Sequence, residues 1–186
     1  MKRAGRRSLA ALWLIGGLGI ATLVSGCGSS TPDAAPAKTT TTDSTATSTT
    51  LSTQATAVLS AYRAAWSAFE GALADANPSD PALAATMVNP QLEGVKANIY
   101  ADQRQGIIGR GTFVLHPKIV SLSTATATVV DCAYSTAALV YQSTGKPVPP
   151  VTPPENDGVT STLMLSGGTW KVYKQTVTDG KCASGS

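Results

Sequence analysis

Apolar residues between positions 55 and 78 recur every three or four positions, which is the period of an α-helix. The repeat stops before Asn77–Pro78, a pair that is typical of a helix end. We therefore predict one amphipathic helix here. Its inward face carries Val58, Tyr62, Trp66 (or Ala65), Phe69 and Leu73.

Two shorter helices are expected to follow. Ser79–Asp80–Pro81 predicts a helix start with proline at the first helical position, and Leu83, Met87 and Val88 would face inward. Pro90 opens a third helical pattern, which Gly106 ends. The inward positions of this third helix are Leu92, Val95, Ile99 and Tyr100 or Gln103.

After Gly111 the apolar period changes from helical to alternating, and β-branched residues become frequent. Gly167–Gly168 predicts a hairpin turn between the last two strands. The segment 145–158 contains five prolines and is expected to be a surface loop, and 106–113 a plain connection. The segments predicted to form strands are 112–123, 124–134, 136–145, 158–167 and 169–178.

Helices followed by an antiparallel sheet predict an α+β domain, with the helices packed on one face of the sheet. The ending GGTWKVYKQTV resembles the last strand of the nuclear transport factor 2-like fold, the cone-shaped family that includes ketosteroid isomerase and the polyketide cyclases. The frame from HPKIV to GGTWKV is similar to that of actinobacterial lipoproteins. The resemblance covers residues 55–183 and implies a curved sheet, but this fold carries enzymes, binding modules and scaffolds alike.

The N-terminus has the parts of an export signal. The basic KRAGRR precedes an apolar run, residues 9–24, that is short and glycine-rich for a membrane span. Val24-Ser25-Gly26-Cys27 looks like a bacterial lipobox, which predicts a signal peptide over 1–26 and acylation (palmitate) of Cys27. The alternative is an ordinary signal or anchor that happens to contain a cysteine. A lipid anchor on the extracytoplasmic face of the cell membrane is the expected location.

Serine and threonine make up 15 of the 27 residues from 28 to 54, with few large apolar side chains. Such a composition cannot offset the entropy of ordering the backbone. We expect residues 27–54 to be a disordered tether, with O-glycosylation left open, and residues 55–186 to form a single domain.

Charge argues against a nucleic acid partner. The formal net charge is +3, and removing the four basic residues of the signal from it leaves −1. The apparent basicity therefore belongs to the signal.

The cysteine count predicts a disulfide. Of three cysteines, Cys27 is the expected lipid site, which leaves Cys132 and Cys182 in an exported domain. Their bridge would pin the C-terminal tail. No C-x-x-C spacing indicates a redox pair.

Asp131 and His116 are the candidate catalytic residues. Alternation places Asp131 on one strand face with Ala127 and Val129, so it would enter the cone if that face lines it. The alternative is a carboxylate at the sheet edge that bonds backbone or a lysine. His116, the only histidine, is either catalytic or structural beside Pro117. The candidates for the phenol of an isomerase-like acid–phenol pair are Tyr62, Tyr100, Tyr134, Tyr141 and Tyr173.

The aromatic stripe of Tyr62, Trp66 and Phe69 predicts either the floor of a ligand pocket or simply core. No metal or cofactor is expected, because no Cys/His/Asp cluster has ligand spacing and no Gly-rich phosphate loop occurs. Ser-His-Asp hydrolysis finds no support, because there is no Gly-x-Ser-x-Gly elbow. The first hypothesis is a non-enzymatic domain that binds a hydrophobic small molecule in the cone or a protein on the open sheet face. The alternatives are an isomerase- or cyclase-like enzyme and a structural spacer.

Overall fold

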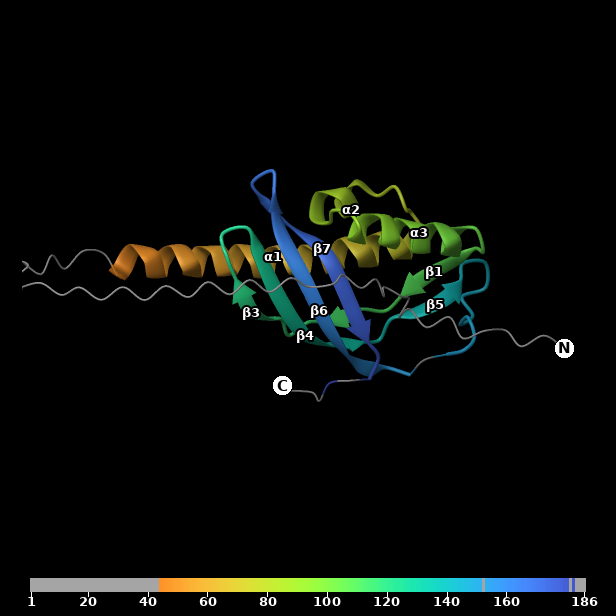
Figure 1. Cartoon of the computed structure of the whole chain (residues 1–186). Helices are drawn as coiled ribbons and strands as arrows, with labels where there is room; N and C mark the ends of the chain where they lie inside the picture. The colour runs from red at the N-terminus through yellow and green to blue at the C-terminus, as the bar shows by residue number, and fades with distance from the viewer. Residues whose placement is uncertain (1–43, 152, 181, 183–186) are drawn as a thin grey trace, which may run out of the picture.

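The helices lie along one side of a curved antiparallel sheet in the computed structural model, which describes residues 44–151, 153–180 and 182 (Figure 1). The long helix α1 (Ser44–Ala74) runs the length of the domain, and the chain then forms α2 (Pro81–Thr86) and α3 (Gln91–Gln103). Asp80 caps α2, since its carboxylate accepts the backbone N–H of Ala82. The predicted α+β architecture, three helices followed by a sheet, is confirmed.

The main sheet has five strands, and all neighbouring pairs are antiparallel. Strands β2, β4, β6 and β7 follow one another across the sheet, and β3 pairs with β4 beside β2. Gly167 and Gly168 both have positive φ values, as the predicted hairpin between β6 and β7 requires. The strand bounds are β2 Phe113–Val114, β3 Lys118–Leu122, β4 Thr126–Ser135, β6 Glu155–Ser166 and β7 Thr169–Thr178.

The core lies between α1 and the inner sheet face. Val58, Tyr62, Ala65 and Trp66 of α1 are buried there, while Phe69 and Leu73 are half-buried. The sheet contributes the buried side chains of Ala127, Val129, Ala133, Val159, Leu163, Trp170 and Val172.

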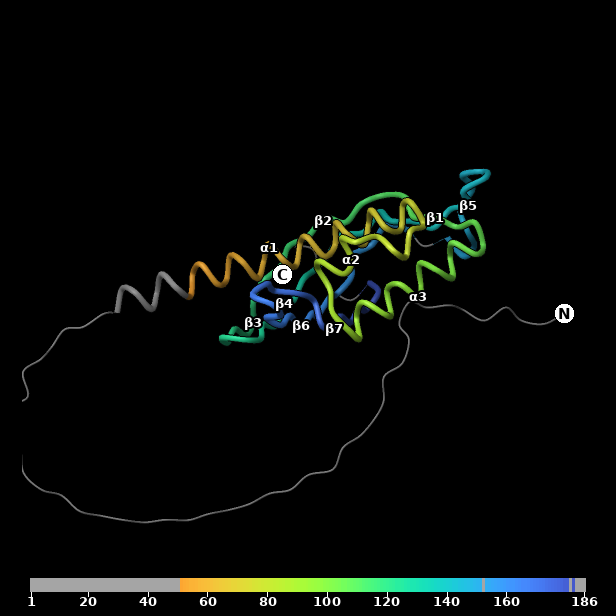
Figure 2. Tube along the Cα trace, turned by 90° about the horizontal axis from the view of Figure 1, so that it is seen from above, coloured from red at the N-terminus to blue at the C-terminus, as the bar shows by residue number. Residues whose placement is uncertain are grey.

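Helix α1 begins at Ser44, inside the segment predicted to be a disordered tether, so that prediction is wrong from Ser44 to Gln54. The extension from Ser44 to Gln54 is about three helical turns. Extending an existing helix costs far less than nucleating a new one, because each further residue adds one hydrogen bond. The side chain of Gln54 also donates to the carbonyl of Ser123, 2.8 Å away, which ties the end of this extension to the chain just after β3. Figures 1 and 2 show α1 continuing beyond the sheet at its N-terminal end.

Two further segments differ from the predictions. The expected connection 106–113 contains a strand, β1 (Ile107–Arg110), which pairs with β5 (Ala138–Tyr141) as a separate ribbon at the C-terminal end of α1 (Figure 2). Strand β6 begins at Glu155, so the last residues of the proline-rich loop belong to the sheet. Both segments are strands because a partner strand supplies their backbone hydrogen bonds, which local composition does not reveal.

Candidate functional site

Asp131 lies on the inner face of β4 and is only 6% exposed. Its Oδ2 accepts the hydroxyl of Tyr62 from α1 at 3.0 Å. Its Oδ1 accepts the backbone N–H of His116, which lies between β2 and β3, at 2.7 Å. One carboxylate therefore joins the helix, the central strand and the edge of the sheet.

Pro117 explains why this carboxylate is needed. Strands β2 and β3 both pair with β4, and the chain between them breaks the ladder, where Pro117 has no N–H to donate. The Asp131 side chain satisfies the N–H of His116 in place of a strand carbonyl. The ring of His116 in turn lies with Nδ1 3.2 Å from the carbonyl oxygen of Cys132. Because a carbonyl only accepts, this contact places the proton on Nδ1.

Tyr62 is fully buried, and its pKa is raised well above 10.0. Burial is the main cause, because it disfavours the charged phenolate, and the negative charge of Asp131 adds to it. Tyr62 therefore remains a hydrogen-bond donor to Asp131 at physiological pH. Its ring meets Trp66 edge to face, with the centroids 6.4 Å apart.

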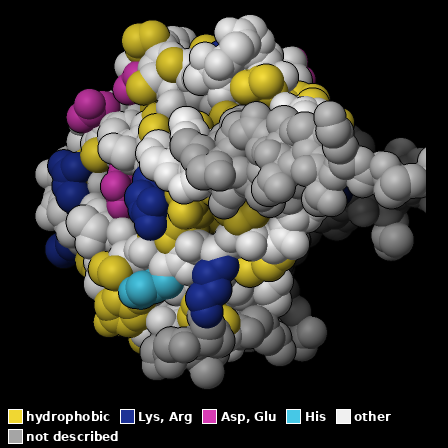
Figure 3. All heavy atoms as spheres, turned by 90° about the vertical axis from the view of Figure 1, so that its left-hand side faces the viewer, with side chains coloured by type: hydrophobic (Ala, Val, Ile, Leu, Met, Phe, Trp, Pro, Cys, Tyr) yellow, Lys and Arg dark blue, Asp and Glu magenta, His cyan; other side chains and the backbone are white. Residues whose placement is uncertain are grey.

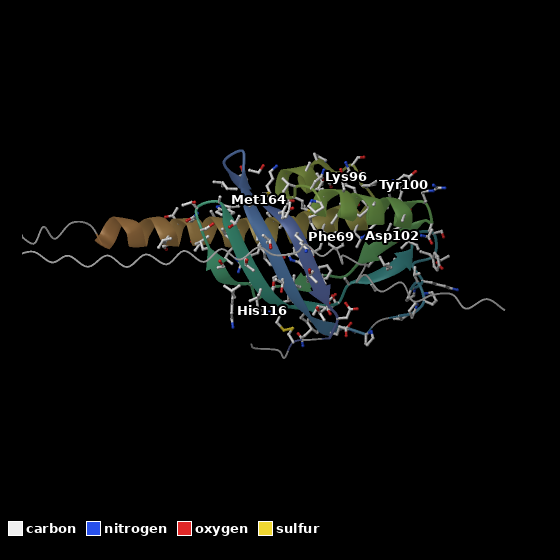
Figure 4. The ribbon with its side chains drawn as sticks, viewed as in Figure 1. Phe69, Lys96, Tyr100, Asp102, His116 and Met164 are labelled. Atoms are coloured by element: carbon white, nitrogen blue, oxygen red, sulfur yellow. A yellow bond between two sulfur atoms is a disulfide. The ribbon has the colours of Figure 1, made fainter. Side chains whose placement is uncertain are left out.

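The aromatic stripe is part of the core. Trp66 contacts Phe113 of β2 with the ring centroids 4.5 Å apart, and Phe69 lies 6.3 Å from Phe113 by the same measure (Figure 4 labels Phe69). Neither of the two hollows described below is bounded by Tyr62, Trp66 or Phe69. The other phenol candidates are on the surface, with exposed fractions between 38% and 52%: Tyr100, Tyr134, Tyr141 and Tyr173.

The structure joins Cys132 to Cys182 as predicted, with their Cα atoms 5.8 Å apart. This bridge holds the end of the described chain against β4. Cys27 lies outside the described residues, so its predicted acylation stays a prediction.

Two hollows on the surface of the described residues concern the candidate site. The smaller, about 250 Å³, lies between the end of α1 and strands β1 and β2, and Glu70 and Arg110 are among its lining residues. The larger of the two, about 620 Å³, is an open groove at one end of the sheet, where His116, Lys118, Asp131, Thr160 and Thr178 surround the disulfide. Figure 4 labels His116 near the yellow S–S bond, and Figure 3 shows the histidine at the surface among basic side chains.

Neither a metal centre nor a membrane-spanning helix is found in the part of the chain that the structure describes. No group of three or more histidine, cysteine or acidic side chains there could hold a metal ion. No described helix is both long and apolar enough to cross a bilayer.

Comparison with known proteins yields structural neighbours only. No protein-family model matches the sequence, and no curated protein does either. The intermembrane space region of chloroplast protein ARC6 is 12% identical over 67% of this chain and 96% of its own, with a TM-score of 0.53. A putative dehydratase of the NTF2-like family from Streptomyces avermitilis is 15% identical over 69% of this chain and 97% of its own, with a TM-score of 0.43. A protein with a cystatin-like fold from Nostoc punctiforme is 12% identical over 69% of this chain and 92% of its own, with a TM-score of 0.41.

NTF2-like and cystatin-like folds recur in the descriptions of the neighbours. The described residues of this chain form helices and a curved, open antiparallel sheet. The domain has the α+β fold that the order of helices and strands in the sequence predicted. The neighbours include proteins described as putative dehydratases and proteins of unknown function. At 12% identity, the likeness to the ARC6 region shows the fold alone.

Proposed function

We propose that this protein is an extracytoplasmic lipoprotein, anchored through Cys27, whose domain binds a partner without catalysing a reaction. The proposal that the domain binds without catalysis rests on the hydrogen bonds and the burial of Asp131. Both of its oxygens are hydrogen-bonded to groups of the fold itself, and the carboxylate is 6% exposed.

A general acid or base must reach the proton that it transfers, directly or through one water molecule. Tyr62 is fully buried. Asp131 borders the groove of about 620 Å³, but it is only 6% exposed, and both of its oxygens already accept hydrogen bonds, from Tyr62 and from the backbone N–H of His116 beside Pro117. The interior of the cone is filled by the side chains of Tyr62, Trp66 and the residues around them. A partner is therefore expected to bind on the outside of the domain.

One observation favours a second candidate, an isomerase- or cyclase-like enzyme. A buried carboxylate and a phenol with a raised pKa lie 3.0 Å apart, and such a pair can donate and accept protons. This function requires the core around Tyr62 to open and admit a substrate.

Native mass spectrometry of the full chain, extracted in mild detergent, distinguishes the two. A binding domain carries a non-covalent adduct that is lost on denaturation and that Asp131→Asn retains unchanged. An enzyme converts its bound small molecule to a species of different mass during incubation, and D131N abolishes that conversion. The second result would replace the binding proposal with the enzyme.

A further inference from the structure

The strand register aligns hydroxyl-bearing side chains in rows on the sheet face that points away from the helices. Asp131 and Val129 face the core, so their neighbours Thr128 and Val130 face outward. One row runs across four strands from β3 to β7 and consists of Lys118, Val130, Thr160 and Thr176. The adjacent row consists of Ser121, Thr128, Thr162 and Lys174.

We call these eight residues the threonine face. The strands lie about 4.8 Å apart, so each row extends about 14 Å from its first residue to its last. One row ends in a lysine at β3 and the other in a lysine at β7, with serine or threonine hydroxyls between them. No hydrogen bond to another described residue engages the hydroxyls of Thr128, Thr160, Thr162 and Thr176, so these groups are available to a ligand.

The threonine face carries positive charge only, although the predicted mature chain has a net charge of −1. Both lysines are exposed, and neither row contains a carboxylate. The nearest acid of the sheet is Asp131, which borders the groove described next, but both of its oxygens are engaged by Tyr62 and His116. Asp157 and Asp179 lie at the end where the tail folds back, and there Gly180 donates its N–H to Asp157. The positive charge is therefore a local feature of this face.

The groove of about 620 Å³ continues the threonine face toward the disulfide and shares Lys118, Val130 and Thr160 with it. His116 also borders the groove. Because its Nδ1 is held by the carbonyl of Cys132, its Nε2 is the nitrogen left to meet a ligand. The volume is within the range of small-ligand sites.

We propose that the threonine face and this groove bind an acidic glycan, a saccharide chain that bears carboxylate groups. This inference rests on the proposed function as a binding domain and names its partner class. The threonine hydroxyls exchange hydrogen bonds with sugar hydroxyls, and Lys118 and Lys174 pair with the carboxylates. The disulfide and Val130 supply the apolar floor of the groove.

Other occupants fit the face less well. A second copy that used the same face would bring Lys118 and Lys174 of one copy near those of the other, and like charges repel. A neutral saccharide would leave both lysines without a counter-charge. Charge complementarity together with the free hydroxyls therefore favours an anionic saccharide.

The test measures binding of the full chain in mild detergent by calorimetry, with three probes. Oligogalacturonate carries sugar and charge, its methyl ester carries the sugar without the charge, and poly-glutamate carries charge without sugar. We expect the wild type to bind oligogalacturonate about tenfold more tightly than the ester, because each surface ion pair contributes a few-fold. Poly-glutamate is expected to bind more weakly than oligogalacturonate.

Matched variants locate the site. K118Q/K174Q should abolish the preference for the charged sugar, and T160V/T162V should weaken binding of both sugars a few-fold. Lys96→Gln is the control, because Lys96 is exposed on α3 in the helical layer (Figure 4). Circular dichroism of each variant verifies that it is folded.

Several outcomes would overturn the inference: no saturable binding of oligogalacturonate, equal binding of poly-glutamate, or an equal loss in K96Q. Dimerisation of the wild type that K118Q/K174Q strengthens, because the repulsion between the lysines is then removed, would instead assign the face to a second copy. If K118Q/K174Q still carries the native adduct while oligogalacturonate does not bind, the proposed binding function stands and the glycan inference falls.

Discussion

Tyr62 and Asp131 form the buried polar contact that links α1 to the sheet. Tyr62→Phe removes only the hydroxyl, so it leaves the packing intact and deprives one oxygen of Asp131 of its donor. We expect the free energy of unfolding to fall by about 1–3 kcal/mol, the usual cost of a buried polar group that loses its partner. Urea unfolding at pH 7 measures this loss, and Tyr141→Phe is the control, because Tyr141 is exposed at the end of β5. Equal stability of Y62F and Y141F would contradict it.

Because of the Tyr62 hydroxyl, we expect the stability of the protein to depend on pH in the alkaline range. The pKa of Tyr62 is raised in the folded protein because burial and the Asp131 charge disfavour the phenolate. The protonated phenol therefore contributes stability that is fully present below the unfolded pKa of about 10 and is lost as the pH rises above it.

We expect the stability difference between the wild type and Y62F to be constant from pH 7 to 9. Above pH 10 it should shrink by about 1.4 kcal/mol per pH unit, because the unfolded chain then releases one proton that the folded chain retains. Urea unfolding of both proteins between pH 7 and 11 measures it. A difference that is independent of pH throughout this range would show that Tyr62 ionises as easily in the fold as in the unfolded chain.

At the scale of elements, the disulfide Cys132–Cys182 closes a separation of 50 residues and fixes the tail beside the groove. Chain entropy predicts that C132A/C182A loses roughly 3–4 kcal/mol of unfolding free energy. Urea unfolding with and without a thiol reductant measures this: the reductant should destabilise the wild type and leave the variant unchanged. Destabilisation of the variant by the reductant would point to an effect other than this bridge.

The period of apolar residues predicted the elements that bury one regular apolar face against the core. The helical stripe from Val58 to Leu73 and the alternation of 169–178 correspond to α1 and β7. Strand β1 was not predicted, because IIGR is short and its pairing with β5 depends on contacts far along the chain. Its Gly109 also lies so close to α1 that an added Cβ would come within 2.6 Å of Leu73, a constraint that only the packed structure reveals.

The candidate site was predictable in part. Alternation along β4 indicated that Asp131 could face inward, and the alternative of a carboxylate that bonds backbone describes its contact with His116. Nothing in the sequence selected Tyr62 from the five tyrosines, because the two residues of the pair are 69 positions apart. The threonine face was not predicted, although the alternating threonines of TATAT, TST and TVT indicate strands with hydroxyl groups on one face.

At the scale of the whole molecule, the two faces of the sheet have separate roles. The inner face is committed to the core, where even the carboxylate of Asp131 serves the fold. The outer face carries unengaged hydroxyls and lysines, which is what a binding surface requires. Helix α1 starts 17 positions after Cys27, and an extended chain of that length spans at most about 60 Å. A domain held at Cys27 therefore stays close to the membrane.

The anchoring itself gives the last prediction. When the full chain is expressed in a bacterium fed an alkyne analogue of palmitate, the wild type should carry the label and sediment with membranes, since each buried methylene contributes about 0.8 kcal/mol. Cys27→Ser should lose the label, whereas the control C132A/C182A should keep it. If C27S remains labelled, another residue is acylated and the lipobox interpretation is wrong. If C27S is unlabelled yet still sediments with membranes, the uncleaved apolar run 9–24 holds it there, and N-terminal sequencing would find the signal peptide attached.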